Sequence, residues 1–445
     1  MLIAIENTVC LNAGDAAILL ALMREMRRVF GQETQFAVFD ADPEVAARYF
    51  PGIDFRPQVS SLLTVPRLPA RIFGRSWAIR LRRNAERVLR AEFRRVVRSI
   101  GKGGDGQSLL LGSALRENID LYRKADLVVS TGGTYLVEHY DLDAKLIEFE
   151  KDMALRKPLI LFTQSMGPFT DPRNRQRLQK VLGYAGLTLV REERSLGHIR
   201  DLGVVAANVA VAADSVFVLA DPAVMQRAAA RVATPPKRVA VSVRDWAHFA
   251  TRTTEAGMAE YEQAVERAVV ALVERYGTEI VFVSTCQGIK EYRYDDSVVA
   301  KRIVSRLPES VRSLVSVDDK FHTPDALIEQ LDGFDFVIST RMHMAILALC
   351  AGVPVLPIAY EFKTTELFAS LGQQNWVTDI DAIEAASFEA LVMKFAEAPG
   401  PYSAEVFSRV SALAASARSA ADRIATTVGK PAAHVASPAH LKANA

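Results

Sequence analysis

The sequence contains little of what several classes of protein depend on. Its three cysteines, Cys10, Cys286 and Cys350, lie far apart in apolar contexts, so no pair has zinc-ligand spacing. We expect them to be free, buried thiols in a reducing compartment. No run of about 18 apolar residues is present, which argues against a helix that spans a membrane. The formal net charge of +2 gives no overall signature of nucleic-acid binding.

The N-terminus also lacks the features of a signal peptide. No basic segment precedes the first apolar run, and that run is broken by Asn7, Asn12, Gly14 and Asp15. We therefore expect a cytoplasmic protein, and contact with the inner face of the cytoplasmic membrane stays open. We expect no metal site, no cofactor and no nucleic-acid partner, and the sequence does not indicate an oligomeric state.

The chain does contain enough apolar material for two cores. Half of its 445 residues are hydrophobic, and this length exceeds one ordinary domain. Short apolar runs alternate with helical patterns in both halves, as in the βαβ units of a parallel sheet. The expected fold class is therefore α/β, with two Rossmann-like domains facing each other across a cleft, the arrangement called GT-B in glycosyltransferases.

Changes in composition divide the chain. We predict an N-terminal domain over 1–220, with a basic helical insertion near 66–120. A linker that contains Ala, Pro and Lys follows over 221–237 and leads to a C-terminal domain over 238–400. A helix over 401–429 is expected to cross back to the N-terminal domain, and the tail over 430–445 to be disordered.

The stretch 334–363 is the part around which the rest is organised. Two apolar runs in it read as buried strands, and each ends in polar side chains. These are Arg341 and His343 after the first strand, and Tyr360, Glu361 and Lys363 after the second. Ligands of open α/β sheets bind outside the carboxyl ends of the strands. An arginine at a helix N-terminus suits a phosphate or a carboxylate, so we predict an anion site here.

This pattern resembles the polysaccharide pyruvyl transferase family, and the resemblance extends over about residues 5 to 380. The motifs that carry it are, in order, Asn12-Ala13-Gly14-Asp15 before a helix, Gly132-Gly133 after a strand, Gln164 with Gly167-Pro168, Arg191 followed by Ser195, Asp214, Arg244, Arg341-Met342-His343, Gly352-Val353-Pro354, and Tyr360 with Lys363. No single motif is specific, but their order and spacing are.

Membership of that family implies that phosphoenolpyruvate donates a pyruvyl group to two hydroxyls of one sugar, with release of phosphate. The acceptor is a glycan, in this family often lipid-linked, which we assign to the N-terminal domain, and the donor to the C-terminal one. The implied catalytic residues are His343, Asp15 and Arg341. The implied substrate-binding residues are Asn12, Gly14, Gly132, Gly133, Arg191, Arg244, Arg341 and Lys363.

Several of these residues also have a plain structural explanation. Arg341 and His343 can cap a helix or satisfy nearby backbone, and Asp15 is an ordinary helix N-cap. The double glycine can allow a neighbouring helix to approach closely. Arg191 can form an exposed salt bridge with Glu192 or Glu193, which contributes little stability.

The segment 71–102 is strongly basic, with ten Arg, one Lys and two Glu, and it has a broken apolar face. A basic amphipathic helix of this kind can lie on an anionic membrane. A solvated helix packed on the N-terminal domain, or a dimer surface, explains the pattern equally well.

Three other functions are compatible with the sequence. One is a GT-B glycosyltransferase that uses a nucleotide sugar, although no acidic clamp for a ribose is evident apart from Glu361. Another is a non-catalytic homologue that binds glycans. The third is a transferase of the same fold acting on a different small anion.

Overall fold

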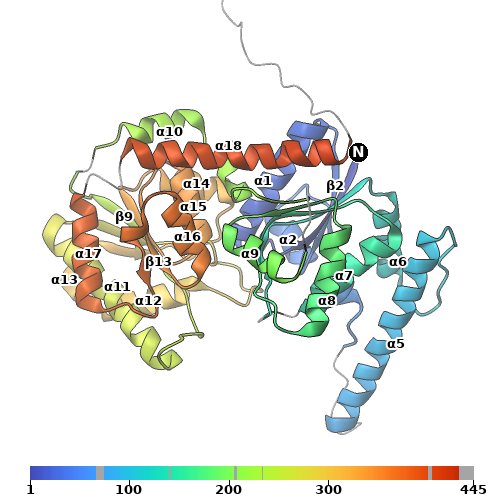
Figure 1. The fold of residues 1–445 in the computed structure, drawn as a ribbon. Helices are drawn as coiled ribbons and strands as arrows, with labels where there is room; N and C mark the ends of the chain where they lie inside the picture. Colours follow the sequence, from blue (N-terminus) through green and yellow to red (C-terminus); the bar gives the residue numbers. More distant parts are fainter. Residues whose placement is uncertain are drawn as a thin grey trace, which may run out of the picture.

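The computed structural model describes residues 1–66, 75–138, 140, 142–204, 208–232, 234–398 and 403–429. Within them the chain forms two parallel sheets with helices packed against them (Figure 1). The first has the order β3-β2-β1-β4-β6-β7-β8, with β5 beside β6, and the second has the order β11-β10-β9-β12-β13-β14. Both therefore begin in the middle and wind outwards, as in a Rossmann sheet. The predicted fold class is confirmed.

The first sheet and its helices come from the N-terminal half. The elements are β1 (Leu2–Thr8), α1 (Ala13–Phe30), β2 (Gln35–Asp40), α2 (Pro43–Tyr49), β3 (Phe55–Pro57), α3 (Val59–Leu62), α5 (Arg75–Gly101), α6 (Ser113–Lys124), β4 (Leu127–Ser130), β5 (Gly133–Leu136), α7 (Leu142–Leu155), β6 (Leu159–Met166), α8 (Pro172–Tyr184), β7 (Leu187–Val190), α9 (Glu193–Asp201), β8 (Val209–Val211), the 3-10 helix η1 (Ser215–Leu219) and α10 (Pro222–Ala229).

The second sheet follows, and the last helix comes after it. The elements are β9 (Arg238–Ser242), α11 (Thr254–Tyr276), β10 (Glu279–Phe282), α12 (Asp296–Arg306), α13 (Glu309–Arg312), β11 (Val315–Val317), α14 (Pro324–Leu331), β12 (Phe336–Ser339), α15 (Met342–Cys350), β13 (Val355–Ala359), α16 (Phe362–Ser370), η2 (Gln374–Trp376), β14 (Thr378–Asp379), α17 (Ala385–Glu397) and α18 (Ala404–Thr427).

The central strands are buried along their length, which explains their apolar sequences. Every residue of β6 is buried, as are all four of β4 and of β12. Strands of a parallel sheet are covered by helices on both faces, so they read as continuous apolar runs and not as alternating ones. Polar residues therefore gather where the strands end.

The segment 221–237, predicted as a linker, contains helix α10. Asp221 accepts hydrogen bonds from the backbone N–H groups of Ala223 and Val224, and Pro222 occupies the first turn. Both features start helices, and Met225 and Ala228 are buried against the second domain's core. The predicted linker thus includes a helix that its Ala- and Pro-rich composition did not indicate.

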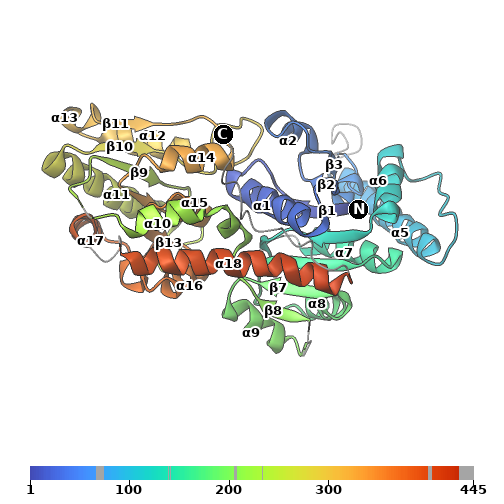
Figure 2. The same cartoon turned by 90° about the horizontal axis from the view of Figure 1, so that it is seen from above.

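Helix α18 crosses back to the N-terminal domain, as expected. Figure 2 shows it lying along both halves of the molecule. Its Asp422 forms an ion pair of 2.8 Å with Arg28 of α1. Near its end, Ala421 and Ile424 are fully buried in the core of the first domain. The helix thus fixes the two domains relative to each other.

The basic segment forms one long helix, α5. Its C-terminal part packs against α7 through the buried side chains of Phe93, Val96 and Val97, whereas its N-terminal end projects away from the body (Figure 1). Residues 67–74 of the predicted insertion and the predicted tail 430–445 lie outside the described residues. None of the helices in the described segments is both long and apolar enough to cross a membrane.

Candidate functional site

The carboxyl ends of the two sheets face each other, and the motif residues lie there. The N-terminus of α1 reaches the second domain, where the backbone N–H of Ala13 donates to the carbonyl of Thr285 at 2.8 Å. Lys363, after β13, reaches back and donates to Oγ1 of Thr134 in the first domain at 3.2 Å. The site is therefore built from both domains.

Gly14 is the point of closest approach between the two motifs. A Cβ on Gly14 would lie 2.6 Å from Cβ and 2.9 Å from Nδ1 of His343. Real Cβ atoms do not approach other atoms so closely, so only glycine allows α1 to pack against the imidazole. This explains the glycine in the N-terminal motif as a packing partner of the histidine in the C-terminal one.

Asn12, and not Asp15, caps helix α1. The Asn12 Oδ1 accepts from the backbone N–H of Gly14 at 2.9 Å, and its Nδ2 donates to Oδ2 of Asp15 at 3.0 Å. The capping role weighed for Asp15 is thus taken by Asn12, which also holds the Asp15 carboxylate in place. Asp15 is left available for chemistry.

The environment of Asp15 favours its protonated form. Burial raises the pKa of this carboxyl, and the positive charges of His343, Lys363 and Arg191 only partly oppose that effect, so the pKa is raised overall. A carboxyl of this kind holds its proton to a higher pH than an exposed one. It is therefore a candidate general acid or base.

Asp214, at the end of the first sheet, links Arg191 to His343. Arg191 Nη1 pairs with Asp214 Oδ2 at 2.5 Å, and the same oxygen lies 3.5 Å from His343 Nε2. Burial raises the pKa of Asp214, but the charge of Arg191 and the contact with His343 outweigh it and hold the pKa below its usual range. Asp214 is thus a carboxylate that stays ionised, and it can orient the imidazole.

Arg191 makes a pair with neither of the glutamates that follow it. Besides Asp214, its guanidinium donates to Ser165 Oγ at 2.8 and 3.0 Å and to Thr134 Oγ1 at 2.9 Å. Glu192 accepts instead from Ser165 Oγ at 2.9 Å. The side chain of Arg191 is only 5% exposed, and each of its three guanidinium nitrogens has a protein partner, which favours an organising role over direct contact with an anion.

Arg341 is held by a carboxylate that the sequence analysis did not identify as its partner. Its Nε and Nη2 donate to the two oxygens of Asp296 at 2.8 and 2.6 Å, and the Asp296 side chain is only 3% exposed. This bidentate pair neutralises the charge predicted to bind the substrate. Nη1 is the Arg341 nitrogen that the pair leaves for a ligand.

Lys363 and Arg244 differ in how far their charges are compensated. Lys363 forms an ion pair with Glu361 at 2.7 Å. Burial alone would lower the pKa of Lys363, but Tyr360 and Glu361 have the larger, opposite effect, so the pKa is raised overall and the amine stays charged. Arg244 lies 4.0 Å above the ring of Tyr360 and 4.8 Å from that of Trp246. Among the described residues no carboxylate pairs with Arg244, so this cation is available for an anionic ligand.

The double glycine is explained in part by packing. A Cβ on Gly132 would lie 2.5 Å from Oγ1 and 2.9 Å from the carbonyl oxygen of Thr163 in β6, and Gly133 has a φ of 145°. Strand β6 is the nearest neighbour, and helix α1, the alternative considered, also approaches closely, with Cγ2 of Ile18 at 3.2 Å. Ligand contact by Gly132 and Gly133 stays a prediction.

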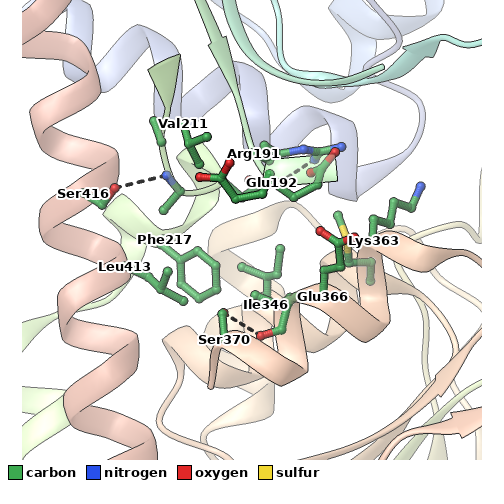
Figure 3. Close-up of a pocket in the computed structure, with 16 residues that line it drawn as sticks. Arg191, Glu192, Val211, Phe217, Ile346, Lys363, Glu366, Ser370, Leu413 and Ser416 are labelled. Carbon is green, nitrogen blue, oxygen red and sulfur yellow. Dashed lines mark hydrogen bonds and ion pairs between the residues drawn. The ribbon is translucent and has the colours of Figure 1, made fainter. Parts of the chain in front are cut away.

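A cavity of about 350 Å³ lies between the domains and α18 (Figure 3). Arg191, Asp214 and Lys363 line it, and Phe217, Ile346 and Leu413 give it an apolar wall. In the figure Arg191 and Lys363 lie away from the Leu413 side of the cavity. Asp15, Arg244, Arg341 and His343 are not part of its lining, so it adjoins the motif cluster without enclosing it.

Several organising residues carried only a weak signal in the sequence. Asp214 and Asp296 stand at strand or helix ends, where acids are common, so their partners were not predictable. Thr134 and Ser165 are small polar residues at the sheet edge. Within the described segments, no group of three or more His, Cys, Asp or Glu side chains is placed to hold a metal ion.

Comparison with known proteins gives a consistent result. The family model for polysaccharide pyruvyl transferase matches residues 12–361. The amylovoran biosynthesis protein AmsJ of Erwinia amylovora is 26% identical over 405 residues, which cover 88% of this chain and 91% of that protein.

Solved structures with the same fold are much more distant in sequence. Anabaena Alr3699/HepE in complex with UDP and glucose matches with a TM-score of 0.52 at 12% identity, over 96% of this chain and 99% of that one. A putative UDP-N-acetylglucosamine 2-epimerase from Listeria monocytogenes matches with a TM-score of 0.53 at 11% identity, over 96% and 95%. At these identities the likeness shows the fold alone.

Proposed function

The chain belongs to the polysaccharide pyruvyl transferase family, and on that premise we propose that it moves the pyruvyl group of phosphoenolpyruvate onto two hydroxyls of one sugar. The product is a pyruvate ketal on a cell-surface or exopolysaccharide precursor, and phosphate is released. One observation carries the proposal. The motifs of the two halves meet at one place, where Gly14 packs against His343 and Asp214 faces the same imidazole.

The donor is assigned to the second domain because its cations suit a small, doubly anionic molecule. Phosphoenolpyruvate carries a carboxylate and a phosphate on three carbons. Arg244 supplies an uncompensated guanidinium, Lys363 a charged amine, and Arg341 its remaining Nη1. The N-termini of α15 and α16 lie beside these side chains and add free backbone N–H groups, which favour anions.

The proposed reaction needs one proton donor and one proton acceptor. The methylene carbon of phosphoenolpyruvate takes a proton and becomes a methyl group, while a sugar hydroxyl adds to the neighbouring carbon. The second hydroxyl then adds as the phosphate leaves. Of the two hydroxyl protons released, one replaces the proton used on the methyl group and the other leaves with phosphate.

His343 and Asp15 are placed for these transfers. The imidazole of His343 can both donate and accept a proton, and Asp214 Oδ2 faces its ring at 3.5 Å. Asp15 lies on the first domain, next to the same imidazole, with a raised pKa. Because the cations can take up the charge of the leaving phosphate, the proposed reaction uses no resident cofactor.

The acceptor sugar is assigned to the first domain. Three buried oxygen acceptors at the ends of its central strands have no hydrogen-bond donor in the described part of the chain: Asn7 Oδ1 in β1, and Thr163 Oγ1 and Gln164 Oε1 in β6. Buried acceptors are normally satisfied. Sugar hydroxyls are donors of the right kind to satisfy them.

The direct test is a coupled assay with purified protein, phosphoenolpyruvate and a panel of oligosaccharides. Release of phosphate that depends on both substrates, together with a new ketal methyl signal in the proton NMR spectrum of the sugar, supports the proposal. Turnover of a nucleotide sugar in place of phosphoenolpyruvate would replace it with the glycosyltransferase alternative.

A further inference from the structure

Helix α5 extends beyond the part of the N-terminal domain against which it packs. It runs for 27 residues, from Arg75 to Gly101. Its second half is fixed by the buried side chains of Phe93, Val96 and Val97 and by ion pairs of Arg90 with Asp143 and of Arg94 with Glu150 at 3.2 Å. Its first half projects from the N-terminal domain (Figure 1). The projecting half contributes nothing to the site described above.

One stripe of this helix consists of arginines. Residues that recur every three or four positions lie on the same face of an α-helix, and six arginines follow that spacing: Arg80, Arg83, Arg87, Arg90, Arg94 and Arg98. Of these, Arg90 and Arg94 have the carboxylate partners named above. Among the described residues no carboxylate pairs with the other four, and all four are exposed.

The apolar stripe of α5 continues beyond the part that the body covers. Trp77 and Ile79 precede Arg80, and they are 62% and 47% exposed. By helical spacing Ile79 lies on the same side as Phe93 and Val97, whereas Trp77 lies across the helix from them, so the two residues flank the arginine stripe on its two sides. A tryptophan next to arginines on an exposed helix is typical of a segment that rests at a membrane interface.

A groove continues the arginine stripe onto the body of the domain. It has a volume of about 530 Å³ and lies between α5, α7 and α8, with Phe93 on its floor. Arg94, Arg98, Arg177 and Lys180 line it, against one acid, Glu150, in the same lining. Its excess of positive charge and its size suit the phosphate of a lipid headgroup.

We propose that α5 and this groove are a docking surface for an anionic lipid bilayer. The unpaired arginines contact lipid phosphates, Trp77 and Ile79 enter the interface, and the groove receives one headgroup. The charges are complementary, and the stripe runs along one side of a straight helix, as contact with a plane requires. With a net charge of only +2 for the whole chain, the attraction is local to this surface.

The test is flotation of the full-length protein with vesicles of phosphatidylcholine alone or with about one third phosphatidylglycerol. We expect binding only to the anionic vesicles, weakened by salt because exposed charges are screened. Changing Arg80, Arg83, Arg87 and Arg98 together to Gln is expected to lower the partition coefficient by on the order of a hundredfold to a thousandfold. These arginines have no carboxylate partners in the described structure, so the variant is expected to fold normally.

The matched control removes the same number of positive charges from other surfaces of the protein. Arg24, Arg200, Arg227 and Arg423 are exposed residues of α1, α9, α10 and α18. Their replacement by Gln is expected to leave vesicle binding within about twofold of wild type, since they lie far from the stripe. A second variant, Trp77→Ala with Ile79→Ser, should weaken binding at high salt more than at low salt.

Three results would overturn the proposal. One is equal binding to neutral and anionic vesicles, and another is an equal loss in the control and stripe variants. The third is the absence of vesicle binding while single-stranded RNA binds and depends on the four stripe arginines, which would assign the surface to nucleic acid.

Discussion

The imidazole Nε2 of His343 lies 3.5 Å from Oδ2 of Asp214, so a histidine of the second domain faces a carboxylate of the first. Arg191 holds that carboxylate from the other side. The ring is therefore oriented by a residue that follows the last strand of the opposite sheet. Catalysis by His343 should consequently depend on the contact between the domains as well as on the histidine itself.

Removal of the imidazole tests whether His343 is catalytic. His343→Ala should lower kcat by roughly a hundredfold to ten thousandfold, the usual contribution of a general acid or base. The melting temperature should change much less than kcat, because the contact of Nε2 with Asp214 Oδ2 is long, at 3.5 Å, and Asp214 keeps its ion pair with Arg191. Kinetics and thermal melting on one preparation check this. Loss of folding together with activity would show that His343 is structural.

The two acids beside His343 should affect stability in opposite directions. Asp15 has a raised pKa, so its stabilising contribution is present below its ordinary value of 3.8 and is lost as the pH rises through the raised value. At a pH above the raised pKa the buried carboxylate is charged and destabilises the fold, so Asp15→Asn should raise the melting temperature there while lowering kcat. The measurement is thermal melting from pH 4 to pH 8.

Asp214 has a lowered pKa, so its ionised carboxylate stabilises the folded protein at a pH above 3.8, the ordinary pKa of an aspartate. This stabilisation is lost as the pH falls towards the lowered pKa. Asp214→Asn should destabilise the protein at pH 7 by about 3–5 kcal/mol, because it leaves the buried Arg191 without its partner. The effect should shrink in strong acid. Equal changes in both variants would contradict the assigned environments.

Close packing between the motifs predicts a large effect from one methyl group. Gly14→Ala places a Cβ against His343 and should cost about 1–3 kcal/mol and most of the activity, because overpacking forces the two elements apart. The control is Gly183→Ala in α8, where an added Cβ meets nothing within 4 Å. That change should be neutral or slightly stabilising, as is usual for an exposed helix position.

Equal melting temperatures for Gly14→Ala and Gly183→Ala, measured in the same buffer, would show that α1 does not pack against the imidazole in solution.

Two arginines predicted to bind the donor should differ in their main role: Arg244 in binding phosphoenolpyruvate and Arg341 in stabilising the fold. Arg244→Gln should weaken phosphoenolpyruvate binding by about tenfold to a hundredfold, as is typical of a lost hydrogen bond to a charged group. Its melting temperature should be unchanged because no carboxylate is left without a partner.

Arg341→Gln should instead destabilise the fold by about 3–5 kcal/mol, since it leaves the buried carboxylate of Asp296 without its ion-pair partner. Calorimetry and thermal melting on both variants give the comparison. Loss of binding in Arg341→Gln with unchanged stability would assign Arg341, and not Arg244, as the principal anion ligand.

Much of the site was predictable because parallel sheets collect polar residues at one edge. Apolar runs locate the strands, and the residues after them are those that meet in space. Arg341, His343 and Lys363 were placed at the sheet edge by this argument, and so was the two-domain fold, whereas Asp15 and Arg244 followed from the family resemblance.

The partners of these residues were not predictable from spacing. Asp296 lies 45 positions from Arg341, and nothing in the chain indicates that the two pair. Asn12 and Asp15 are equally good helix caps by type, and the choice depends on where helix α1 begins, which is at Ala13. The helix within 221–237 was missed because composition was given more weight than its Asp-Pro start.

The most direct test of the account is calorimetric titration of the purified protein with phosphoenolpyruvate, beside UDP and GDP sugars. Wild type, Arg244→Gln and the control Gly183→Ala are compared. The account predicts saturable binding of phosphoenolpyruvate that is weakened in Arg244→Gln and unchanged in Gly183→Ala. Binding of a nucleotide sugar with none of phosphoenolpyruvate would contradict the pyruvyl donor and leave the fold and the family assignment standing.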